Sequence, residues 1–232
     1  MKYRYEMHRH TSPCSHCGKA DPEKLPIVMK EEGYTGCVIT DHFYYGNSGI
    51  ERTLPWNEFC RPYEETYLKA KAVGDKIDFD ILFGIEEHVG EGKEILIYGI
   101  TPEFMYKYPE MREGGLERIY KFAKNENALV IQAHPFRSRD YIPEPMKKLS
   151  PDFLDGYELF NASNKPEDNK NAFEIYSGSG KIFTAGTDCH RDNTIVPAAG
   201  IETDVRIKSE KQLADILRSG NYQLFGVDFT EV

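Results

Sequence analysis

An N-terminal stretch, MHRHTSPCSHCGKAD, contains three histidines and two cysteines within eleven consecutive positions. Imidazole and thiolate groups are ligands that transition metals prefer, so the stretch predicts a metal site. Two kinds of site fit it. One is a structural zinc site built on Cys14-x-x-Cys17. The other is a catalytic metal centre that begins with His8-x-His10 and includes His16 as a further candidate ligand.

The remaining cysteines favour the catalytic alternative. A structural zinc site usually needs four Cys or His ligands in two closely spaced pairs, and no second Cys-x-x-Cys follows in this chain. Cys37, Cys60 and Cys189 are isolated from one another. The five cysteines are odd in number, and the N-terminus MKYRYEMHRH lacks the apolar segment of a signal peptide. We therefore expect reduced thiols and a cytoplasmic protein.

The composition narrows the class of partner. The chain has 232 residues, of which 40% are hydrophobic and 29% charged, with a formal net charge of -9. This charge disfavours long nucleic acid and anionic membranes, and no apolar run approaches the roughly 20 residues that cross a bilayer. A small phosphorylated substrate remains compatible, because bound cations reverse the local field. The sequence carries no signal for an oligomeric state.

Further metal-ligand residues lie at the C-terminal ends of expected strands. The strands are expected at residues 3–8, 35–42, 79–89, 129–136 and 181–190. In β/α barrels and in open α/β sheets, active sites form at this end of the strands. Alternate residues of a strand share a face, so neighbouring candidates two positions apart point the same way. The candidates in chain order are His8, His10, His42, Glu86, His88, His134, Asp188 and His190.

The elements that position these residues alternate between apolar strands and amphipathic helices. This alternation predicts an α/β fold with a mainly parallel sheet of seven or eight strands, either open or closed into a barrel. One exception is expected, a hairpin in which Gly90-Glu91-Gly92 joins residues 79–89 to 93–100. No repeat, long linker or low-complexity segment divides the chain, so residues 1–232 are predicted to form one domain.

Five motifs occur in the order MHRHT, VITDH, GIEE, AHP and GTDCH over residues 7–190. As an ordered set they resemble the motifs of the polymerase-and-histidinol-phosphatase (PHP) family. The resemblance implies a distorted (β/α)7 TIM-like barrel, a centre of two to three divalent metal ions, and phosphoester hydrolysis. Imidazole and carboxylate ligands together suit Zn, Mn or Fe better than Mg or Ca.

The resemblance also implies a grouping of the ligands. The first metal would be held by His8, His10, Glu86 and Asp188, the second by Glu86 and His134, and the third by His42, His190 and His16. One departure is visible. Many PHP proteins supply a further histidine for the second metal from the strand after the GIE motif, and here that strand, EILIYGITPE, has none. His88, on the same face of its strand as Glu86, is the unassigned histidine and the candidate that compensates; the alternatives are a more weakly bound second metal or a water molecule in the gap.

The leading functional hypothesis is a metal-dependent phosphatase that uses an activated water to hydrolyse a small phosphomonoester, such as a histidinol-phosphate-like compound, a sugar phosphate or a nucleotide phosphate. Asp188 or a neighbouring histidine such as His190 would transfer the proton, and Arg137 would bind phosphate oxygens through its planar guanidinium. Two alternatives remain. One is an amidohydrolase that cleaves a C–N bond, and the other is a catalytically degenerate PHP module stabilised by metal.

Overall fold

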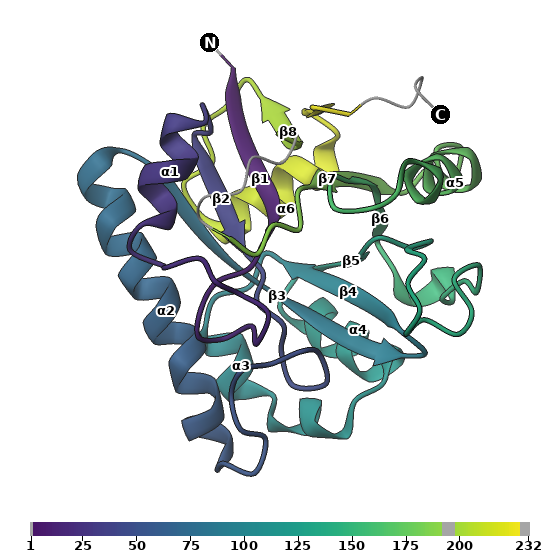
Figure 1. The fold of residues 1–232 in the computed structure, drawn as a ribbon, viewed down its shortest axis with the longest axis horizontal. Coiled ribbons are helices and arrows are strands. Elements are labelled where there is room, and N and C mark those ends of the chain that lie inside the picture. Colours follow the sequence, from purple (N-terminus) through teal and green to yellow (C-terminus); the bar gives the residue numbers. More distant parts are fainter. Residues whose placement is uncertain (1, 192–197, 228–232) are drawn as a thin grey trace.

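The computed structural model describes residues 2–191 and 198–227 of the chain. Nine strands within these ranges form one sheet, in the spatial order β7-β6-β5-β4-β3-β2-β1-β8-β9 (Figure 1). The strands are β1 (Tyr3–Arg9), β2 (Gly36–Ile39), β3 (Asp80–Gly90), β4 (Lys93–Tyr98), β5 (Leu129–Gln132), β6 (Gly156–Asn161), β7 (Ile182–Gly186), β8 (Gly200–Thr203) and β9 (Gln223–Phe225). The helices are α1 (Leu25–Glu31), α2 (Trp56–Ile77), α3 (Glu103–Lys107), α4 (Leu116–Asn125), α5 (Pro166–Tyr176) and α6 (Glu210–Ser219). Two short 3-10 helices span Pro109–Glu113 and Pro151–Phe153.

The sheet is mixed, whereas the sequence predicted a mainly parallel one. Strands β1, β2 and β3 are parallel, and so are β5, β6 and β7, but β4 is antiparallel to both of its neighbours. Strand β8 is likewise antiparallel to β1 and β9. The direction of β4 follows from the predicted hairpin between β3 and β4. Gly90, Glu91 and Gly92 all have positive φ angles, of 109°, 56° and 72°, which allows the chain to reverse within a tight turn.

The sheet curls until its distant strands meet, which makes it a nearly closed barrel. The backbone N–H of Asp188, just after β7, donates to the carbonyl of His8 at 2.9 Å, and the N–H of His10 donates to the carbonyl of Cys189 at 3.2 Å. These bonds join the end of β1 to the segment that follows β7. The prediction of a barrel-like α/β fold is therefore confirmed, and the closure brings the first and last ligand motifs together.

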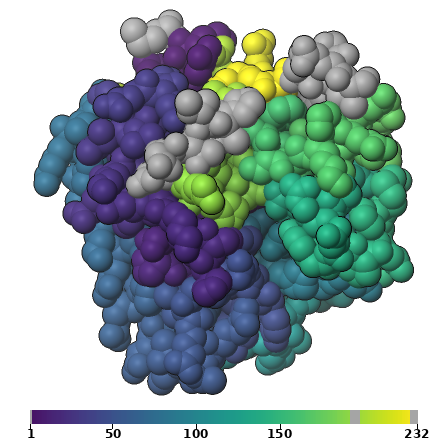
Figure 2. Space-filling model, in the orientation of Figure 1, coloured from purple at the N-terminus to yellow at the C-terminus, as the bar shows by residue number. Residues whose placement is uncertain are grey.

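Apolar packing covers both faces of the central strands. Every residue of β2 and β5 is buried, the pattern expected of strands covered on both sides. In Figure 1, α1 and α2 flank the β1–β3 part of the sheet, and α5 lies beside β6 and β7. In Figure 2 the purple and blue segments form the left part of the visible face and the teal and green segments the right part. Among the described residues, no helix has the length and hydropathy that a membrane crossing requires.

Candidate metal centre

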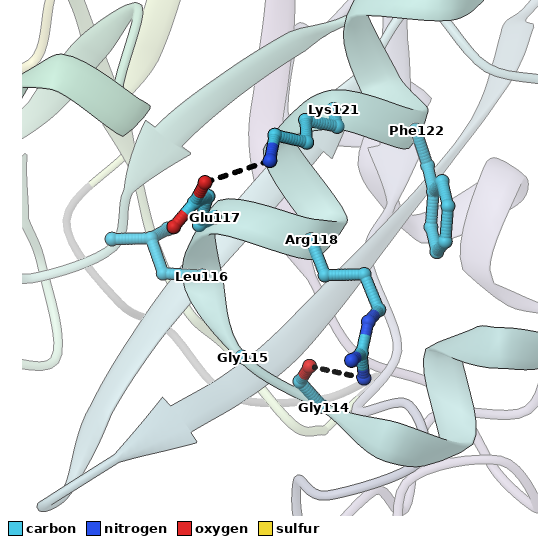
Figure 3. Close-up of a pocket in the computed structure, with 7 residues that line it drawn as sticks. All are labelled: Gly114, Gly115, Leu116, Glu117, Arg118, Lys121 and Phe122. Atoms are coloured by element: carbon cyan, nitrogen blue, oxygen red, sulfur yellow. Dashed lines mark hydrogen bonds and ion pairs between the residues drawn. The ribbon is translucent and has the colours of Figure 1, made fainter.

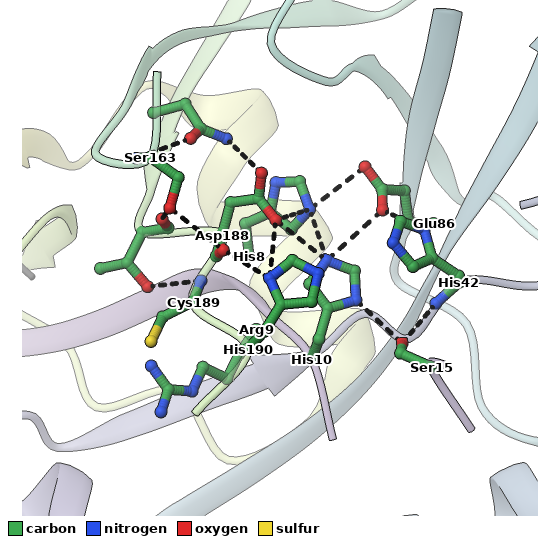
Figure 4. A network of polar contacts seen from close by, with 12 residues as sticks. His8, Arg9, His10, Ser15, His42, Glu86, Ser163, Asp188, Cys189 and His190 are labelled. Atoms are coloured by element: carbon green, nitrogen blue, oxygen red, sulfur yellow. Dashed lines mark hydrogen bonds and ion pairs between the residues drawn. The ribbon is translucent and has the colours of Figure 1, made fainter. Parts of the chain in front are cut away.

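The side chain of Glu86, near the middle of β3, lies at the centre of a group of imidazoles (Figure 4). Its Oε1 atom is 3.2 Å from Nε2 of His8 and 3.1 Å from Nε2 of His134. Its Oε2 atom is 3.4 Å from Nε2 of His10 and 2.7 Å from Nδ1 of His42. The structure therefore brings four imidazoles from three segments onto one carboxylate from a fourth, and all five side chains are buried.

Asp188 extends this group on the side of the barrel closure. Its Oδ1 atom lies 3.2 Å from Nε2 of His10 and 3.7 Å from both Nε2 of His8 and Nδ1 of His190. The backbone of Asp188 has a φ of 52°, and that of His134 a φ of 26°. Left-handed conformations are unfavourable for residues with a side chain, and they concentrate at functional sites. Two of the predicted ligands thus lie in strained backbone positions.

Glu94, which the sequence analysis did not single out, also joins the group. Its carboxylate oxygens lie 3.4 Å from Nε2 of His134 and 3.6 Å from Nδ1 of His42. Glu94 pairs with His88 across the β3–β4 hairpin, in the register that also pairs Glu86 with Leu96. Because alternate residues of a strand share a face, this register directs Glu94 to the same side as Glu86. In the sequence, Glu94 stands out only as a single carboxylate at the start of an apolar strand.

Two predicted ligands are not brought into the clusters of donors. His16 is exposed, and its backbone N–H donates to the carbonyl of Asn47 at 2.9 Å. The ring of His88 lies against the hairpin, with Nδ1 3.3 Å from the amide of Gly90 and Nε2 3.1 Å from the amide of Gly92. Among the described residues, ligand atoms within 4.8 Å of one another occur in four overlapping sets: His10, His42 and His190; His8, His10 and Asp188; His8, Glu86 and His134; and His42, Glu86 and Glu94.

Glu158, on β6, fixes the orientation of two of these histidines and was also missed in the sequence. Its Oε1 atom accepts a hydrogen bond from Nδ1 of His8 at 2.9 Å, so Nε2 of that ring faces Glu86. Its Oε2 atom accepts from the backbone N–H of His134 at 2.8 Å and from the side-chain amide of Asn161 at 3.0 Å. Carboxylates that hold the outer nitrogen of a metal-binding histidine are a common feature of metal sites.

A second chain of hydrogen bonds orients His10. Its Nδ1 atom lies 3.0 Å from the hydroxyl of Ser15, which in turn donates to Asp41 at 2.7 Å. Asp41 also accepts the backbone N–H of Thr11 at 2.6 Å. Asp41 therefore faces away from the cluster and acts on it through Ser15.

The donor groups fit divalent cations. With their Nδ1 atoms occupied, His8 and His10 present their Nε2 atoms to one another at a separation of 3.2 Å. Two such lone pairs repel unless a proton or a cation lies between them. Nδ1 of His42 and Oε2 of Glu86, although 2.7 Å apart, make no well-directed hydrogen bond and are buried. Buried polar atoms without such a bond are costly, and a bound cation would satisfy them.

The pKa shifts in the cluster reflect opposite charges held close together. Burial acts to raise the pKa of Glu86, but His42 and His8 outweigh it and hold that pKa well below its usual range. Burial likewise opposes the charge on His8, yet Glu158, Glu86 and Asp188 raise the His8 pKa well above its ordinary value. Without metal, protons on the imidazoles therefore compensate the buried carboxylates.

A cavity of about 520 Å³ opens onto the cluster. Arg137 lies in its wall, with its guanidinium hydrogen-bonded to Asp188 and, at 2.9 Å, to the side-chain oxygen of Asn164. The residues that line the cavity are Cys17, His42, Asn47, His88, Gly92, Glu94, Arg137, Tyr141 and His190. Concave sites of this size are typical of small-molecule binding.

A second cavity, of about 510 Å³, lies at the start of α4 and is lined by none of the candidate ligands (Figure 3). The charged side chains that line it contact residues in α4 or just before it. Lys121 pairs with Glu117 at 2.7 Å, and Arg118 donates to the carbonyl of Gly114 at 3.3 Å. The arrangement is that of a solvated helix face, so we assign it no chemistry.

Solved structures with a similar fold were found, although neither a known family model nor a curated protein matches the sequence. A two-domain protein from Bacteroides vulgatus that contains a predicted PHP-like metal-dependent phosphoesterase is 13% identical, with a TM-score of 0.66; the match covers 97% of this chain and 65% of that chain. An amidohydrolase from Chromobacterium violaceum is 13% identical, with a TM-score of 0.60 and coverage of 97% and 99%. The lesion-specific endonuclease PfuEndoQ from Pyrococcus furiosus is 14% identical, with a TM-score of 0.64 and coverage of 99% and 60%.

These similarities establish the fold. The chain has the fold of PHP-like metal-dependent phosphoesterases, so the resemblance seen in its motifs is confirmed at that level. Proteins that share this fold act on different substrates, since an amidohydrolase and an endonuclease are among them. The choice of reaction therefore depends on the site itself.

Proposed function

We propose that this chain is a metal-dependent phosphoesterase that hydrolyses a small phosphomonoester, such as a histidinol-phosphate-like compound, a sugar phosphate or a nucleotide phosphate. The observation that carries the proposal is the position of Glu86, whose two oxygens face four imidazoles from three different segments of the chain. A carboxylate in this position is suited to bridge two cations. The fold, shared with PHP-like phosphoesterases, supports the same reaction class.

The donor sets divide naturally among two to three divalent ions, for which Zn, Mn or Fe would suit the mixture of imidazole and carboxylate. When bound, such ions neutralise phosphoryl charge and acidify a water molecule. Glu94 takes the place at which the expected second-metal histidine is missing. The proposed ligands are His8, His10, Glu86 and Asp188 for the first ion, Glu86, Glu94 and His134 for the second, and His42 and His190 for the third.

Arg137 is proposed to bind the phosphoryl group. Its Nε and Nη2 atoms are hydrogen-bonded to Asn164 and Asp188, which fixes the plane of the guanidinium in the cavity wall. A guanidinium held in this way offers its remaining N–H donors to phosphate oxygens without losing further side-chain entropy. The same contact keeps Asp188 ionised: burial acts to raise the pKa of Asp188, but Arg137 and His8 hold it well below its usual range.

Asp188 and His190 are proposed to move the proton. The ionised Asp188 orients the imidazole of His190, whose Nδ1 atom lies 3.7 Å from its Oδ1 atom, and the imidazole carries the proton. The side chain of His190 is 24% exposed, which gives this pair a connection to solvent. Proton transfer by a positioned carboxylate–imidazole pair is a standard contribution to hydrolysis.

The size and charge of the site favour a small substrate. The cavity of about 520 Å³ accommodates a drug-sized molecule. A net charge of -9 opposes the binding of long nucleic acid, although the likeness to an endonuclease makes DNA a necessary part of any substrate screen.

Amide hydrolysis is the second candidate, favoured by the likeness to an amidohydrolase. Amidohydrolases commonly bridge their two metals with a carbamylated lysine, but a glutamate holds the central position here. Lys93, which lies on the same hairpin, donates to the carbonyls of Pro135 and Pro145 at 3.0 and 2.6 Å. Its amine is thereby committed outside the cluster, which supports phosphoester hydrolysis over amide hydrolysis.

The test is a substrate panel on metal-reconstituted protein. Phosphomonoesters, phosphodiesters, an abasic DNA duplex and amides are each supplied to wild type and to Asp188→Ala. We expect phosphate release from one or more monoesters, and its loss in the variant. Ammonia release without phosphate release would assign the chain to the amidohydrolases, and phosphate release that survives the substitution would reject the proposed centre.

A further inference from the structure

The cavity beside the metal cluster changes in character from its deep end to its open end. Its least exposed residues are charged groups or candidate metal ligands: His42 is 8% exposed, and the side chains of Glu94 and Arg137 are 16% and 12% exposed. Tyr141 and Asn47 line the same cavity but are exposed, and the exposed fraction of Tyr141 is 70%. A ligand of this cavity therefore meets charged groups at one end and an aromatic ring at the other.

Tyr141 belongs to the loop after β5, and contacts with the β3–β4 hairpin hold that loop. The next residue, Ile142, is buried and packs on Gly92, where a Cβ atom would come within 2.9 Å of the Ile142 side chain. Lys93 donates to the carbonyl of Pro145, in the same loop, at 2.6 Å. These contacts fix the segment that follows Tyr141. A ring carried by an ordered segment binds a ligand at a smaller cost in conformational entropy.

His88 supplies a second flat ring to the cavity wall, although it belongs to none of the clusters of ligand atoms among the described residues. Its two nitrogen atoms lie 3.3 and 3.1 Å from the backbone amides of Gly90 and Gly92. The polar atoms of the ring are therefore directed at the hairpin, which leaves its carbon atoms for the cavity. The sequence singled out His88 as a possible metal ligand, and this geometry suits it better to contact an apolar or aromatic group.

We propose that Tyr141 determines specificity by stacking on a planar aromatic or heteroaromatic group of the substrate, with His88 as a second ring surface. This inference rests on the proposed function, because it assigns the leaving-group end of the cavity whose other end holds the phosphoryl group beside Arg137. Aromatic rings pair favourably when offset-stacked or edge to face. A sugar ring is puckered, and its hydroxyl groups need hydrogen-bonding partners. Phosphoesters that carry a flat ring are therefore favoured over sugar phosphates.

The test is calorimetric binding of two phosphonates to the metal-reconstituted, full-length protein. Phenylphosphonate and cyclohexylphosphonate have the same charge and similar size, but only the first is aromatic, and neither has an ester bond to hydrolyse. We expect wild type to bind phenylphosphonate about 3- to 10-fold more tightly, which is the range that aromatic pairing adds beyond apolar burial. Tyr141→Ala should lose this preference, and Tyr141→Phe should keep it because the ring is retained.

Met146→Ala is the matched control. Met146 is on the same loop and is 54% exposed, but it does not line the cavity. The preference for phenylphosphonate should be the same in this variant as in wild type. Circular dichroism of each variant confirms that the fold is retained.

Two results would overturn the inference: no preference for phenylphosphonate in wild type, or a preference that survives in Tyr141→Ala. A merely structural role of Tyr141 would give the second result, because both phosphonates would then weaken alike. The proposed function is read separately, from phosphate release by the same samples. Release from monoesters without an aromatic preference refutes the role of Tyr141 and keeps the function, whereas the preference without hydrolysis of any phosphoester does the reverse.

Discussion

The carboxylate of Glu94, on β4, lies 3.4 Å from Nε2 of His134, which follows β5. Glu94 lies on the strand from which many PHP proteins supply a further histidine for the second metal, and which has no histidine here. Burial and the nearby charge of Glu86 raise the pKa of Glu94 to about 7, so the carboxylate is incompletely ionised at neutral pH when no cation is present. A cation beside His134 would remove this cost, and we propose that Glu94 is one of its ligands.

The substitution Glu94→Gln tests that role. We expect it to weaken the binding of one metal ion by roughly tenfold or more while the others are retained, because a neutral amide is a poorer ligand than a carboxylate. Metal content after dialysis against a weak chelator measures the effect. Glu91→Gln is the matched control, because Glu91 lies on the same hairpin and pairs with Lys147 at the surface. Equal metal content in the two variants would remove Glu94 from the centre.

Glu158 is expected to affect metal affinity through its hydrogen bond to His8. In Glu158→Gln the hydrogen bond to Nδ1 of His8 loses its charge, and the imidazole becomes a weaker and less well oriented ligand. Metal affinity should fall by about 10- to 100-fold, as is usual when the outer partner of a metal-binding histidine is changed. Glu167→Gln, on the exposed face of α5, serves as control. Isothermal titration of stripped protein gives both affinities, and unchanged affinity in Glu158→Gln would disprove the role.

Arg137→Lys separates substrate binding from metal binding. Lysine keeps the charge but loses the planar donor fork, so kcat/KM for a phosphomonoester should fall by about 10- to 100-fold. The metal content should stay as in wild type, because a guanidinium has no free lone pair for a metal ion and lysine keeps a positive charge beside Asp188. Arg139→Lys is the control, since Arg139 donates to the backbone carbonyls of Ser138 and Ser163. A kcat/KM equal to that of wild type would exclude Arg137 from the phosphate site.

Metal affinity should depend on pH through the histidines. Burial opposes the charge on His42, but Glu86 and the Cys17 thiol raise the His42 pKa well above its ordinary value, as the surrounding carboxylates do for His8. Both imidazoles therefore hold protons near pH 7 in the metal-free protein, and metal must displace these protons. Affinity should rise as pH rises from 6 to 8, by about tenfold per unit for each proton released. Calorimetric titrations across this range measure the slope, and a flat profile would contradict the protonation.

The position of the centre could be predicted from the sequence, because the strands end in ligand residues and the barrel brings those ends together. His8, His10, Glu86 and Asp188 converge as their spacing and order indicated.

The features of the fold and site that could not be predicted from the sequence depend on contacts between segments. His88 and Glu94 face each other across the hairpin, and only the pairing register shows that the carboxylate, not the imidazole, reaches His134. The orientation of His16 and Cys17 depends on which loops anchor the turn between them. The antiparallel direction of β4 with respect to β5 is likewise a property of the assembled sheet, as are the unexpected elements α3 and β9.

The most direct test of the account is phosphate release from p-nitrophenyl phosphate by stripped protein as Zn or Mn is returned in known equivalents. The account predicts no release without metal, a rise on addition, and a plateau at two to three equivalents per chain. His8→Ala should remain inactive at every step of the titration. A rate that is unaffected by stripping, or that is unchanged in His8→Ala, would contradict the assignment of this cluster as a phosphoesterase centre.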